Sequence, residues 1–206
     1  MGGWYRFGYV TSLIIARTLF NFEVVHRERI IEKGGAILAM NHESYLDPPL
    51  AGIACRRELY YLARKTLLNW PILGPILPEM NVIPVDQDRA DMSALKAVIK
   101  IVRNGGATVI FPEGARTLDG QLQPAQPGLG LVIAKTMAPV VPMRIFGAHK
   151  AFPRGGKPRP FTPITLVVGE PMFFTKEDLV GEGRALYQGL SERVMERIAA
   201  IQFERP

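Results

Sequence analysis

The sequence predicts an α/β fold in which helices flank a central β-sheet, and two patterns support this prediction. Short apolar runs bounded by glycine, proline or charged residues are typical of buried strands, and such runs lie at 36–40, 59–63, 82–85, 108–111 and 164–169. Between them, apolar residues recur at helical spacing, most clearly at 91–103, 128–136 and 186–201. Alternating strands and helices indicate one sheet packed between helices. Segment 23–29 is predicted as a further strand.

The length of 206 residues fits a single domain with a substantial core, preceded by an N-terminal helical segment. In residues 4–22, aromatic and aliphatic side chains recur near helical spacing, and Arg6 and Arg17 are the basic residues among them. Either this helix lies in a membrane interface with its aromatic side chains at the level of the lipid headgroups, or it covers the domain's own core. We favour the interface, because a mixture of aromatic residues and arginine is typical of that layer. The predicted division is therefore an amphipathic membrane-interface helix at 1–22 and a domain at 23–206 that carries the chemistry.

Composition narrows the class of protein. No apolar run reaches the roughly 18 residues that a membrane-spanning helix needs. A net charge of +6 with a pI near 9.6 suits anionic lipid headgroups, an acidic carrier protein or nucleic acid, and nucleic acid is disfavoured because no recognition motif accompanies the charge. The single cysteine, Cys55, excludes an internal disulfide and suits a reducing cytoplasm. We therefore expect a peripheral or monotopic protein on the cytoplasmic face of a membrane, with Cys55 as a buried, unreactive thiol.

Polar residues gather directly after the apolar run 36–40, in the sequence Asn-His-Glu-Ser-Tyr-Leu-Asp at 41–47, and a short helix is predicted to follow. A strand end holds polar side chains rigidly while leaving them open to a ligand. Five residues along a continuous helix amount to about 500° of rotation, which places two side chains roughly 140° apart. Contact between His42 and Asp47 therefore requires His42 to precede the helix and Asp47 to lie in its first turn. Such a pair is a general base, because a carboxylate on one imidazole nitrogen leaves the other to accept a proton.

Two simpler explanations compete with a catalytic pair. Ser44 followed three residues later by Asp47 matches a helix N-cap with an acid at the third helical position, which alone could account for both residues. A lone histidine is also usually structural. The sequence offers no protein nucleophile, since Gly-x-Ser-x-Gly is absent around every serine. A His-Asp base without its own serine or cysteine would most simply deprotonate a hydroxyl group of the substrate.

A second polar stretch follows the apolar run 108–111, in the sequence Pro-Glu-Gly-Ala-Arg-Thr at 112–117. Asn-His-x-Ser-x-x-Asp followed by Phe-Pro-Glu-Gly-x-Arg resembles the glycerolipid acyltransferase family, whose best-known members are the 1-acyl-sn-glycerol-3-phosphate acyltransferases. A third block, Ala-Pro-Val-Val-Pro-Met at 138–143, is similar to the late Val-Pro strand of that family. The three motifs occur in the family's order, and the resemblance covers roughly residues 24–169.

The resemblance implies a mixed-sheet, glycerol-3-phosphate-acyltransferase-like fold with an N-terminal membrane-contacting helical segment. It implies acyl transfer from acyl-CoA or acyl carrier protein to the free hydroxyl of a lysophospholipid, 1-acylglycerol 3-phosphate first among them, which gives phosphatidic acid. His42 is then expected to be the general base, and Asp47 to orient it and stabilise the imidazolium. Arg116, with help from Lys65 or Arg89, is expected to bind the phosphate through charge-assisted hydrogen bonds.

The remaining residues of the motifs receive supporting roles. Glu113 is expected to position its loop or the glycerol hydroxyl, and Asn41 and Ser44 to buttress the turn. Backbone N–H groups near Gly114 are candidates for stabilising the oxyanion. No metal or bound cofactor is required, and the histidines suggest no metal site, because Leu46 interrupts a His-Glu-x-x-His motif.

The sequence departs from the family's pattern in its second block, Gly-x-Ile-Phe-Ile-x-Arg. Asn81 replaces the glycine, and Gln87 replaces the arginine that is credited with holding the phosphate of the acceptor. Arg89, two residues further on, is either a substitute for that arginine or an exposed charge ahead of a helix. Ala115 stands where the family usually has threonine. These departures concern the identity of the acceptor more than the chemistry.

Segment 144–159 collects the five basic residues Arg144, Lys150, Arg154, Lys157 and Arg159, and we predict that it is a loop. It is either a solvated loop or a contact for anionic lipids or an acidic acyl carrier protein. Three alternatives to the main prediction stay open: the same chemistry on glycerol 3-phosphate, another lysolipid or a lyso-ornithine or sugar lipid; a non-catalytic protein that docks on anionic membranes; and a hydrolase that passes acyl groups to water.

Overall fold

The computed structural model describes residues 1–71, 74–86 and 92–204. Gln87, Arg89 and Asp91 lie outside the described residues, so the predictions about them remain predictions. Within the described chain, the strands form a single sheet in the order β1-β7-β6-β2-β5-β3-β4. Their bounds are β1 Glu23–Val25, β2 Ala36–Met40, β3 Leu59–Arg64, β4 Val82–Val85, β5 Ala107–Ile110, β6 Val140–Phe146 and β7 Thr165–Val168.

The sheet is mixed, as the family resemblance implies. Neighbouring strands of the described chain run parallel, except that β6 and β7 are antiparallel. At its centre, β2 lies between β5 and β6, with Leu38 opposite both Val109 and Val141. All five residues of β2 are buried, which is expected for a parallel strand covered on both faces.

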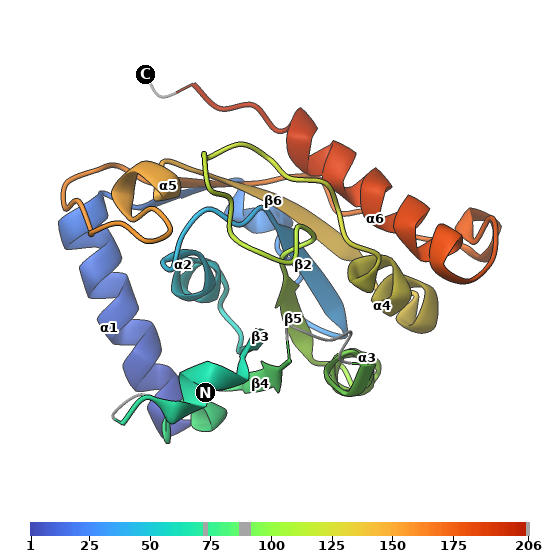
Figure 1. Cartoon of the computed structure of the whole chain (residues 1–206), viewed down its shortest axis with the longest axis horizontal. Helices are drawn as coiled ribbons and strands as arrows, with labels where there is room; N and C mark the ends of the chain where they lie inside the picture. Colours follow the sequence, from blue (N-terminus) through green and yellow to red (C-terminus); the bar gives the residue numbers. More distant parts are fainter. Residues whose placement is uncertain (72–73, 87–91, 205–206) are drawn as a thin grey trace.

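Helices cover the sheet on both sides (Figure 1). Alternate residues of β2 serve the two cores: Leu38 and Met40 pack with α1 and α2, whereas Ile37 and Ala39 pack with α3, α4 and α6. The helices are α1 Gly3–Phe20, α2 Asp47–Ala54, α3 Met92–Arg103, α4 Gly128–Thr136, the short α5 Ala148–Ala151 and α6 Gly183–Ala200. The 3-10 turns are η1 Arg27–Arg29, η2 Lys65–Asn69, η3 Pro78–Met80 and η4 Lys176–Asp178. The predicted α/β architecture is confirmed.

The register of β2 against β5 determines which loops meet. The two strands are parallel, and Ala39 lies opposite Ile110. Both strands therefore end at the same edge of the sheet. The predicted catalytic turn follows β2, and the Glu-Gly-x-Arg loop follows β5. The carboxyl edge of the sheet therefore brings together two motifs that are far apart in the sequence.

Two predicted segments are different in the structure. The strand predicted at 23–29 ends at Val25, because His26 adopts a left-handed conformation (φ 59°) and η1 follows it. The loop predicted at 144–159 begins inside β6 and contains α5. Arg144 is not part of the basic loop, since its guanidinium donates to the carbonyl oxygens of Ala199 and Ile201 at the end of α6.

Helix α1 has one covered face and one open face. Tyr5, Ala16 and Phe20 are buried, and the helix packs against α2. The open face carries the exposed side chains of Trp4, Phe7, Val10, Ile14 and Ile15. The helix thus covers the core and also presents an apolar surface. Among the described residues, no helix combines the length and the apolar character needed to cross a bilayer.

Candidate active site

Asn41 fixes the start of the turn that follows β2. Its side chain is 1% exposed, its Nδ2 donates to the carbonyl oxygen of Ile145, and its Oδ1 accepts from the N–H of the same residue. The amide thus continues the pairing of β2 with β6 by one residue after the strand has ended. Nδ2 also donates to Oε1 of Glu43. This geometry fits the predicted buttressing role.

Asp47 gathers three donors of the turn on a single oxygen. Its Oδ2 lies 2.8 Å from Nδ1 of His42, and it accepts the N–H groups of Glu43 (2.6 Å) and Ser44 (2.7 Å). Asp47 is fully buried and begins α2, whereas His42 precedes the helix. The arrangement that contact between the two residues requires is therefore the one found.

A helix cap explains only part of this turn. The Ser44 N–H donates to the Asp47 carboxylate as in a capping box, but Leu46, not Ser44, is the N-cap residue of α2. The Ser44 hydroxyl instead donates to the carbonyl oxygen of Phe152 and accepts the Leu46 N–H. Ser44 thus ties the turn to the end of α5, and the carboxylate is left to hold the imidazole.

The His42 ring is held in one orientation. It stacks on Phe111, with ring centroids 3.9 Å apart and an interplanar angle of 16°, and its side chain is 16% exposed. Because the Asp47 carboxylate occupies Nδ1, that nitrogen carries the proton of the neutral ring, and Nε2 is left to accept one. The site thus contains a partly open imidazole with a fixed tautomer.

The loop after β5 reaches back to the same turn. Oε1 of Glu113 accepts the His42 N–H at 3.2 Å, and the Thr117 N–H donates to the His42 carbonyl oxygen at 2.9 Å. Glu113 is buried, and burial raises the pKa of its carboxyl group to about 7. Within the described chain its Oε2 has no hydrogen-bond partner. Glu113 therefore links its loop to the backbone of His42, and its role towards the glycerol hydroxyl stays a prediction.

The backbone N–H groups of this loop were expected to include an oxyanion donor, and two of them are already in use. Gly114 has a positive φ of 73° and makes a tight turn, in which its N–H donates to the Phe111 carbonyl oxygen. The Thr117 N–H is likewise used, by His42. These two N–H groups are therefore not free to stabilise an oxyanion, and for the other N–H groups near Gly114 the expectation stays a prediction.

The predicted phosphate-binding residues Arg116 and Lys65 have different surroundings. The Arg116 guanidinium lies over the ring of Tyr45, with Cζ 3.4 Å from the ring centroid. Lys65 follows β3 at the same edge of the sheet, is 57% exposed and lies 4.0 Å from an Asp86 carboxylate oxygen.

Asn81, which replaces a glycine of the family's second block, adopts a left-handed conformation (φ 62°). Asparagine tolerates this conformation, so the replacement of the family's glycine preserves the turn.

Two residues in this region, Glu43 of the turn and His149 of α5, were not predicted as part of the site. Oε2 of Glu43 accepts the backbone N–H of His149 in α5, and its Oε1 accepts from Asn41. Burial raises the pKa of the Glu43 carboxyl group to about 7. The sequence gives no signal for this contact, because Glu43 resembles an exposed charge and His149 lies 106 positions away.

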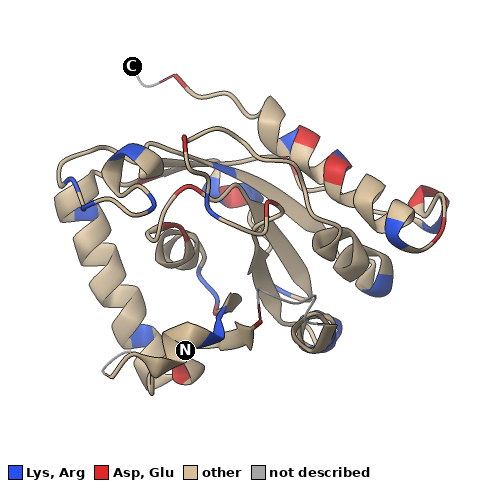
Figure 2. Ribbon diagram, viewed as in Figure 1, with Lys and Arg blue, Asp and Glu red and all other residues tan. Residues whose placement is uncertain are grey.

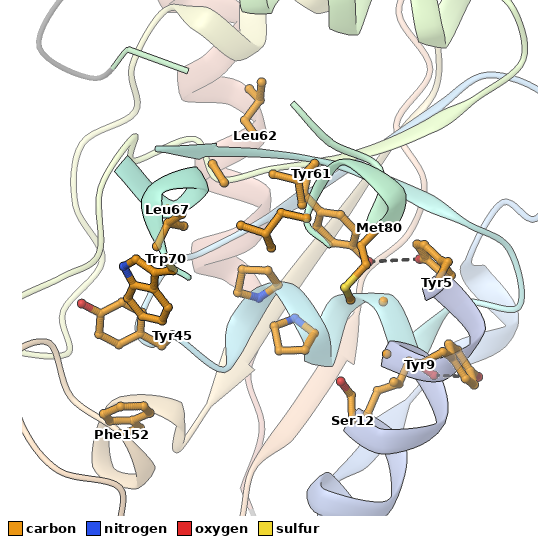
Figure 3. A pocket seen from close by; sticks show the side chains of 18 residues that line it. Tyr5, Tyr9, Ser12, Tyr45, Tyr61, Leu62, Leu67, Trp70, Met80 and Phe152 are labelled. Carbon is orange, nitrogen blue, oxygen red and sulfur yellow. Dashed lines mark hydrogen bonds between the residues drawn. The ribbon is translucent and has the colours of Figure 1, made fainter. Parts of the chain in front are cut away.

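An apolar cavity of about 690 Å³ opens beside the turn. Figure 3 shows Tyr45, Trp70 and Phe152 on one side of it and Tyr5, Tyr61 and Met80 on the other. Its lining comes from α1, the turn, α2, β3 and the following 3-10 turns, and Pro48 and Pro49 of the lining directly follow Asp47. A cavity of this size is typical of ligand sites, and its lining suits a hydrocarbon chain.

Two further predictions concern reactive groups. Cys55 is fully buried, and burial raises the pKa of its thiol to about 12, which confirms a buried thiol. Across the described ranges, no three His, Cys, Asp or Glu side chains are grouped so that they could hold a metal ion.

The fold and the site together define an α/β protein that carries a fixed imidazole base, an arginine and an apolar cavity at one edge of its sheet. The Acyltransferase family model matches residues 21–146, which is more than half of the chain. The chain therefore belongs to the Acyltransferase family.

Relatives include two 1-acyl-sn-glycerol-3-phosphate acyltransferases. The chloroplastic BAT2 of Brassica napus is 27% identical over 147 residues, which are 70% of this chain and 42% of that protein. The Bacillus subtilis protein is 27% identical over 180 residues, which are 82% of this chain and 86% of that protein. The chain thus spans less than half of the plant relative and most of the bacterial one.

A solved structure supports the fold. The structure of the 1-acyl-sn-glycerophosphate (LPA) acyltransferase PlsC from Thermotoga maritima matches with a TM-score of 0.69, covering 98% of this chain and 80% of that one. At 24% identity, this likeness concerns the fold. It includes the N-terminal helix and the mixed sheet.

Proposed function

We propose that this protein transfers a fatty acyl group from a thioester to the free hydroxyl of 1-acylglycerol 3-phosphate, which yields phosphatidic acid. The observation that carries the proposal is the His42–Asp47 pair, with 2.8 Å between Nδ1 and Oδ2, beside an apolar cavity. The names of the relatives, which are 1-acyl-sn-glycerol-3-phosphate acyltransferases, support the choice of acceptor.

The proposed reaction needs no protein nucleophile. Nε2 of His42 accepts the proton of the substrate hydroxyl as its oxygen attacks the thioester carbonyl carbon. The tetrahedral intermediate collapses with cleavage of the C–S bond, and the imidazolium returns the proton to the departing thiolate. Asp47 stabilises the imidazolium, and general base catalysis of this kind contributes about 10²–10⁴-fold. The donor is acyl-CoA or acyl carrier protein, and no metal or bound cofactor takes part in these steps.

The substrate contacts follow from the chemistry of the surrounding side chains. Arg116 binds the phosphate of the acceptor, with Lys65 or Arg89 in support, because guanidinium groups form charge-assisted bonds to phosphate oxygens. The apolar cavity holds an acyl chain. Glycerol 3-phosphate, another lysolipid or a lyso-ornithine or sugar lipid is the alternative acceptor, and Gln87 and Ala115 are the residues that raise this alternative.

We further propose that the protein binds the cytoplasmic face of anionic membranes through α1. At 100° per residue, Trp4, Phe7, Val10 and Ile14 form one apolar stripe, which is exposed. Arg6 and Arg17 lie together along one flank of this stripe, and Figure 2 shows basic residues near both ends of α1.

The membrane contact is tested by replacing an exposed residue of the stripe. Phe7→Ser is expected to reduce sedimentation of the protein with phosphatidylglycerol vesicles. Phe173→Ser, a control at an exposed aromatic residue outside α1, is expected to leave sedimentation unchanged. Equal sedimentation of both variants would reject α1 as the membrane contact.

The experiment that tests the reaction compares the intact protein with His42→Ala, using oleoyl-CoA and 1-acylglycerol 3-phosphate in detergent. We expect phosphatidic acid from the first and a loss of at least about 10²-fold from the second. The matched control is His26→Asn, since His26 is exposed and contacts Glu28, and asparagine tolerates its left-handed backbone; it should keep full turnover.

Each other outcome has a defined meaning. Turnover that survives in His42→Ala overturns the mechanism. Product from neither protein, with acyl carrier protein tried as donor, rejects this acceptor, and the assay then moves to the alternative acceptors. Free fatty acid in place of diacyl product identifies a hydrolase. Membrane binding without turnover on any acceptor identifies a non-catalytic docking protein.

A further inference from the structure

The Arg116 guanidinium is held by a ring and not by a carboxylate. Its Cζ lies 3.4 Å from the centroid of the Tyr45 ring, which is contact distance for a cation–π interaction. Across the described residues, Arg116 forms no ion pair with an acid, and its buried Nη1 has no hydrogen-bond partner. A buried guanidinium nitrogen without an acceptor is costly, so the arginine is prepared for an anionic ligand.

The Tyr45 ring is itself held in place. It packs against Phe152, with ring centroids 5.3 Å apart and an interplanar angle of 41°. The neighbouring Ser44 is fully buried, and its hydroxyl is bonded to the Phe152 carbonyl oxygen. The backbone and the ring of Tyr45 are therefore both anchored to the residue that ends α5, which gives the arginine a fixed surface to rest on.

The same ring is also part of the cavity wall. Tyr45 and Phe152 line the apolar cavity, and Tyr45 lies between His42 and Asp47 in the sequence of the turn. Figure 3 shows Tyr45 and Phe152 at the same side of the cavity. One residue of the catalytic turn thus has a side chain that both contacts the candidate phosphate-binding arginine and lines the apolar cavity.

We infer that Tyr45 is a positioning residue for acceptor recognition: its ring, which lines the cavity, holds Arg116, so that a lysolipid phosphate monoester is bound at a fixed place relative to His42. The inference rests on the proposed function. Tyr45 acts through Arg116 and takes no part in proton transfer. Its hydroxyl is not required, because the contact uses the ring face.

A residue that merely lined the cavity would have different effects. Loss of cavity wall would weaken the binding of an acyl chain whether or not a phosphate is present. Loss of the arginine's support would weaken the binding of the phosphate-bearing acceptor only. The Michaelis constants of the two substrates, and the dependence on Arg116, therefore separate the two possibilities.

The test measures steady-state kinetics of Tyr45→Phe and Tyr45→Leu with 1-acylglycerol 3-phosphate and oleoyl-CoA varied in turn. Tyr45→Leu is expected to raise KM for the acceptor about 5–30-fold, the range of a partly desolvated cation–π contact, with kcat and KM for the donor within about 2-fold. Tyr45→Phe is expected to match the native protein, because it keeps the ring. Phe173→Leu, at an exposed aromatic residue on the segment between β7 and α6, is the matched control.

A double variant makes the dependence on arginine explicit. When Arg116 is already replaced by Ala, adding Tyr45→Leu is expected to raise KM for the acceptor no further. The inference is overturned if the two substitutions act independently, if KM for the donor rises as much as that for the acceptor, or if Tyr45→Phe is as defective as Tyr45→Leu.

Failure of the proposed function gives a different result. If the native protein does not acylate 1-acylglycerol 3-phosphate, its dissociation constant for that lipid, measured by calorimetry without donor, still reports on Tyr45. Binding that weakens 5–30-fold in Tyr45→Leu then supports the inference while the proposed reaction is rejected. Absent binding, or binding insensitive to Tyr45→Leu, overturns the inference as well.

Discussion

The turn after β2 and the substrate side of the site begin at neighbouring strand ends but are built in opposite ways. In the turn, Asn41, Ser44 and Asp47 are buried, and each has two or three hydrogen bonds to fixed backbone or to His42. On the substrate side, Arg116 rests on a ring with a buried nitrogen that lacks a partner, and the adjoining cavity is apolar. The partners that orient His42 are in place without substrate, and in the described chain Oδ1 of Asp47 is the one buried atom of that carboxylate and imidazole pair left without a hydrogen-bond partner. The recognition groups, in contrast, are completed by a phosphate and an acyl chain.

This difference follows from what each part must do. A general base acts only when its orientation is held within a fraction of an ångström, so its partners must be present before substrate arrives. A phosphate brings its own hydrogen-bond acceptors, and an acyl chain brings its own apolar surface. The residues that bind them therefore need no partners before the substrate arrives. Changes to the hydrogen-bonded residues Asn41, Ser44 and Asp47 should therefore reduce kcat. Changes on the substrate side, which includes the ring of Tyr45, should alter KM or selectivity.

The largest effect is expected from Asp47→Asn. The amide keeps the shape of the carboxylate but not its charge, so the tautomer of His42 is no longer fixed and the imidazolium loses its counter-charge. We expect kcat to fall about 10²–10⁴-fold, with KM for both substrates nearly unchanged, in steady-state assays. Asp178→Asn, on the distant η4, serves as the control. A decrease in kcat below 10-fold, or a rise in KM without loss of kcat, would contradict the division between turn and substrate side.

The turn also contains a carboxyl group that should make stability depend on pH. Burial raises the pKa of Glu43 to about 7 in the folded protein, from 4.5 in its ordinary state. Between these values the folded state binds more protons than the unfolded state, so the free energy of unfolding falls as pH rises from 5 to 7 and is then level. The contribution of Glu43 over this interval is about 2 kcal/mol.

Replacing Glu43 by Gln removes this titration while keeping an acceptor for the His149 N–H. Urea unfolding at pH 5, 6, 7 and 8 should show a shallower decline in stability for Glu43→Gln than for the native protein, by about 2 kcal/mol in total. Glu113, whose pKa burial also raises to about 7, retains its own decline in both proteins. Parallel pH profiles for the two proteins would show that Glu43 does not titrate in this interval.

The sequence could predict the turn because its contacts are local. His42 and Asp47 are five positions apart, and the strand before them and the helix after them are enough to decide whether they meet. The sheet, the helices after β4 and the burial of Cys55 were likewise predictable from apolar periodicity. Helix α1 has both of the surfaces that the sequence suggested, one covering the core and one exposed.

The remaining parts of the site depend on tertiary contacts. Tyr45 and Arg116 meet because β2 and β5 are adjacent in the sheet, and Glu43 meets His149 because β6 lies on the other side of β2. Strand order cannot be derived from periodicity. The N–H of Gly114 itself is excluded as an oxyanion donor for a local reason, since the tight turn uses it internally. The cavity could not be predicted from the sequence, because its wall combines residues of several segments between Tyr5 and Phe152.

The smallest effect concerns the part of the cavity wall where a glycine of α2 faces a tyrosine. A Cβ atom at Gly52 would lie 2.4 Å from the Tyr61 hydroxyl, which is paired with the Tyr5 hydroxyl at 3.1 Å. All three residues line the cavity. Gly52→Ala is therefore expected to displace the Tyr61 ring and shorten the space available to an acyl chain, while the turn and its His–Asp pair are untouched.

The measurement is competition between acyl-CoA donors of graded chain length on Gly52→Ala and the native protein. We expect kcat/KM for the longest chains to fall about 2–10-fold relative to the shortest, since one displaced methylene-sized contact is worth about 1 kcal/mol or slightly more. Gly189→Ala is the control, because a Cβ atom there meets nothing within 4 Å. An unchanged chain-length profile in Gly52→Ala would show that the acyl chain does not reach this end of the cavity. A uniform loss of kcat across all chain lengths would instead connect this part of the cavity wall to the turn, and the division between the two regions would fail.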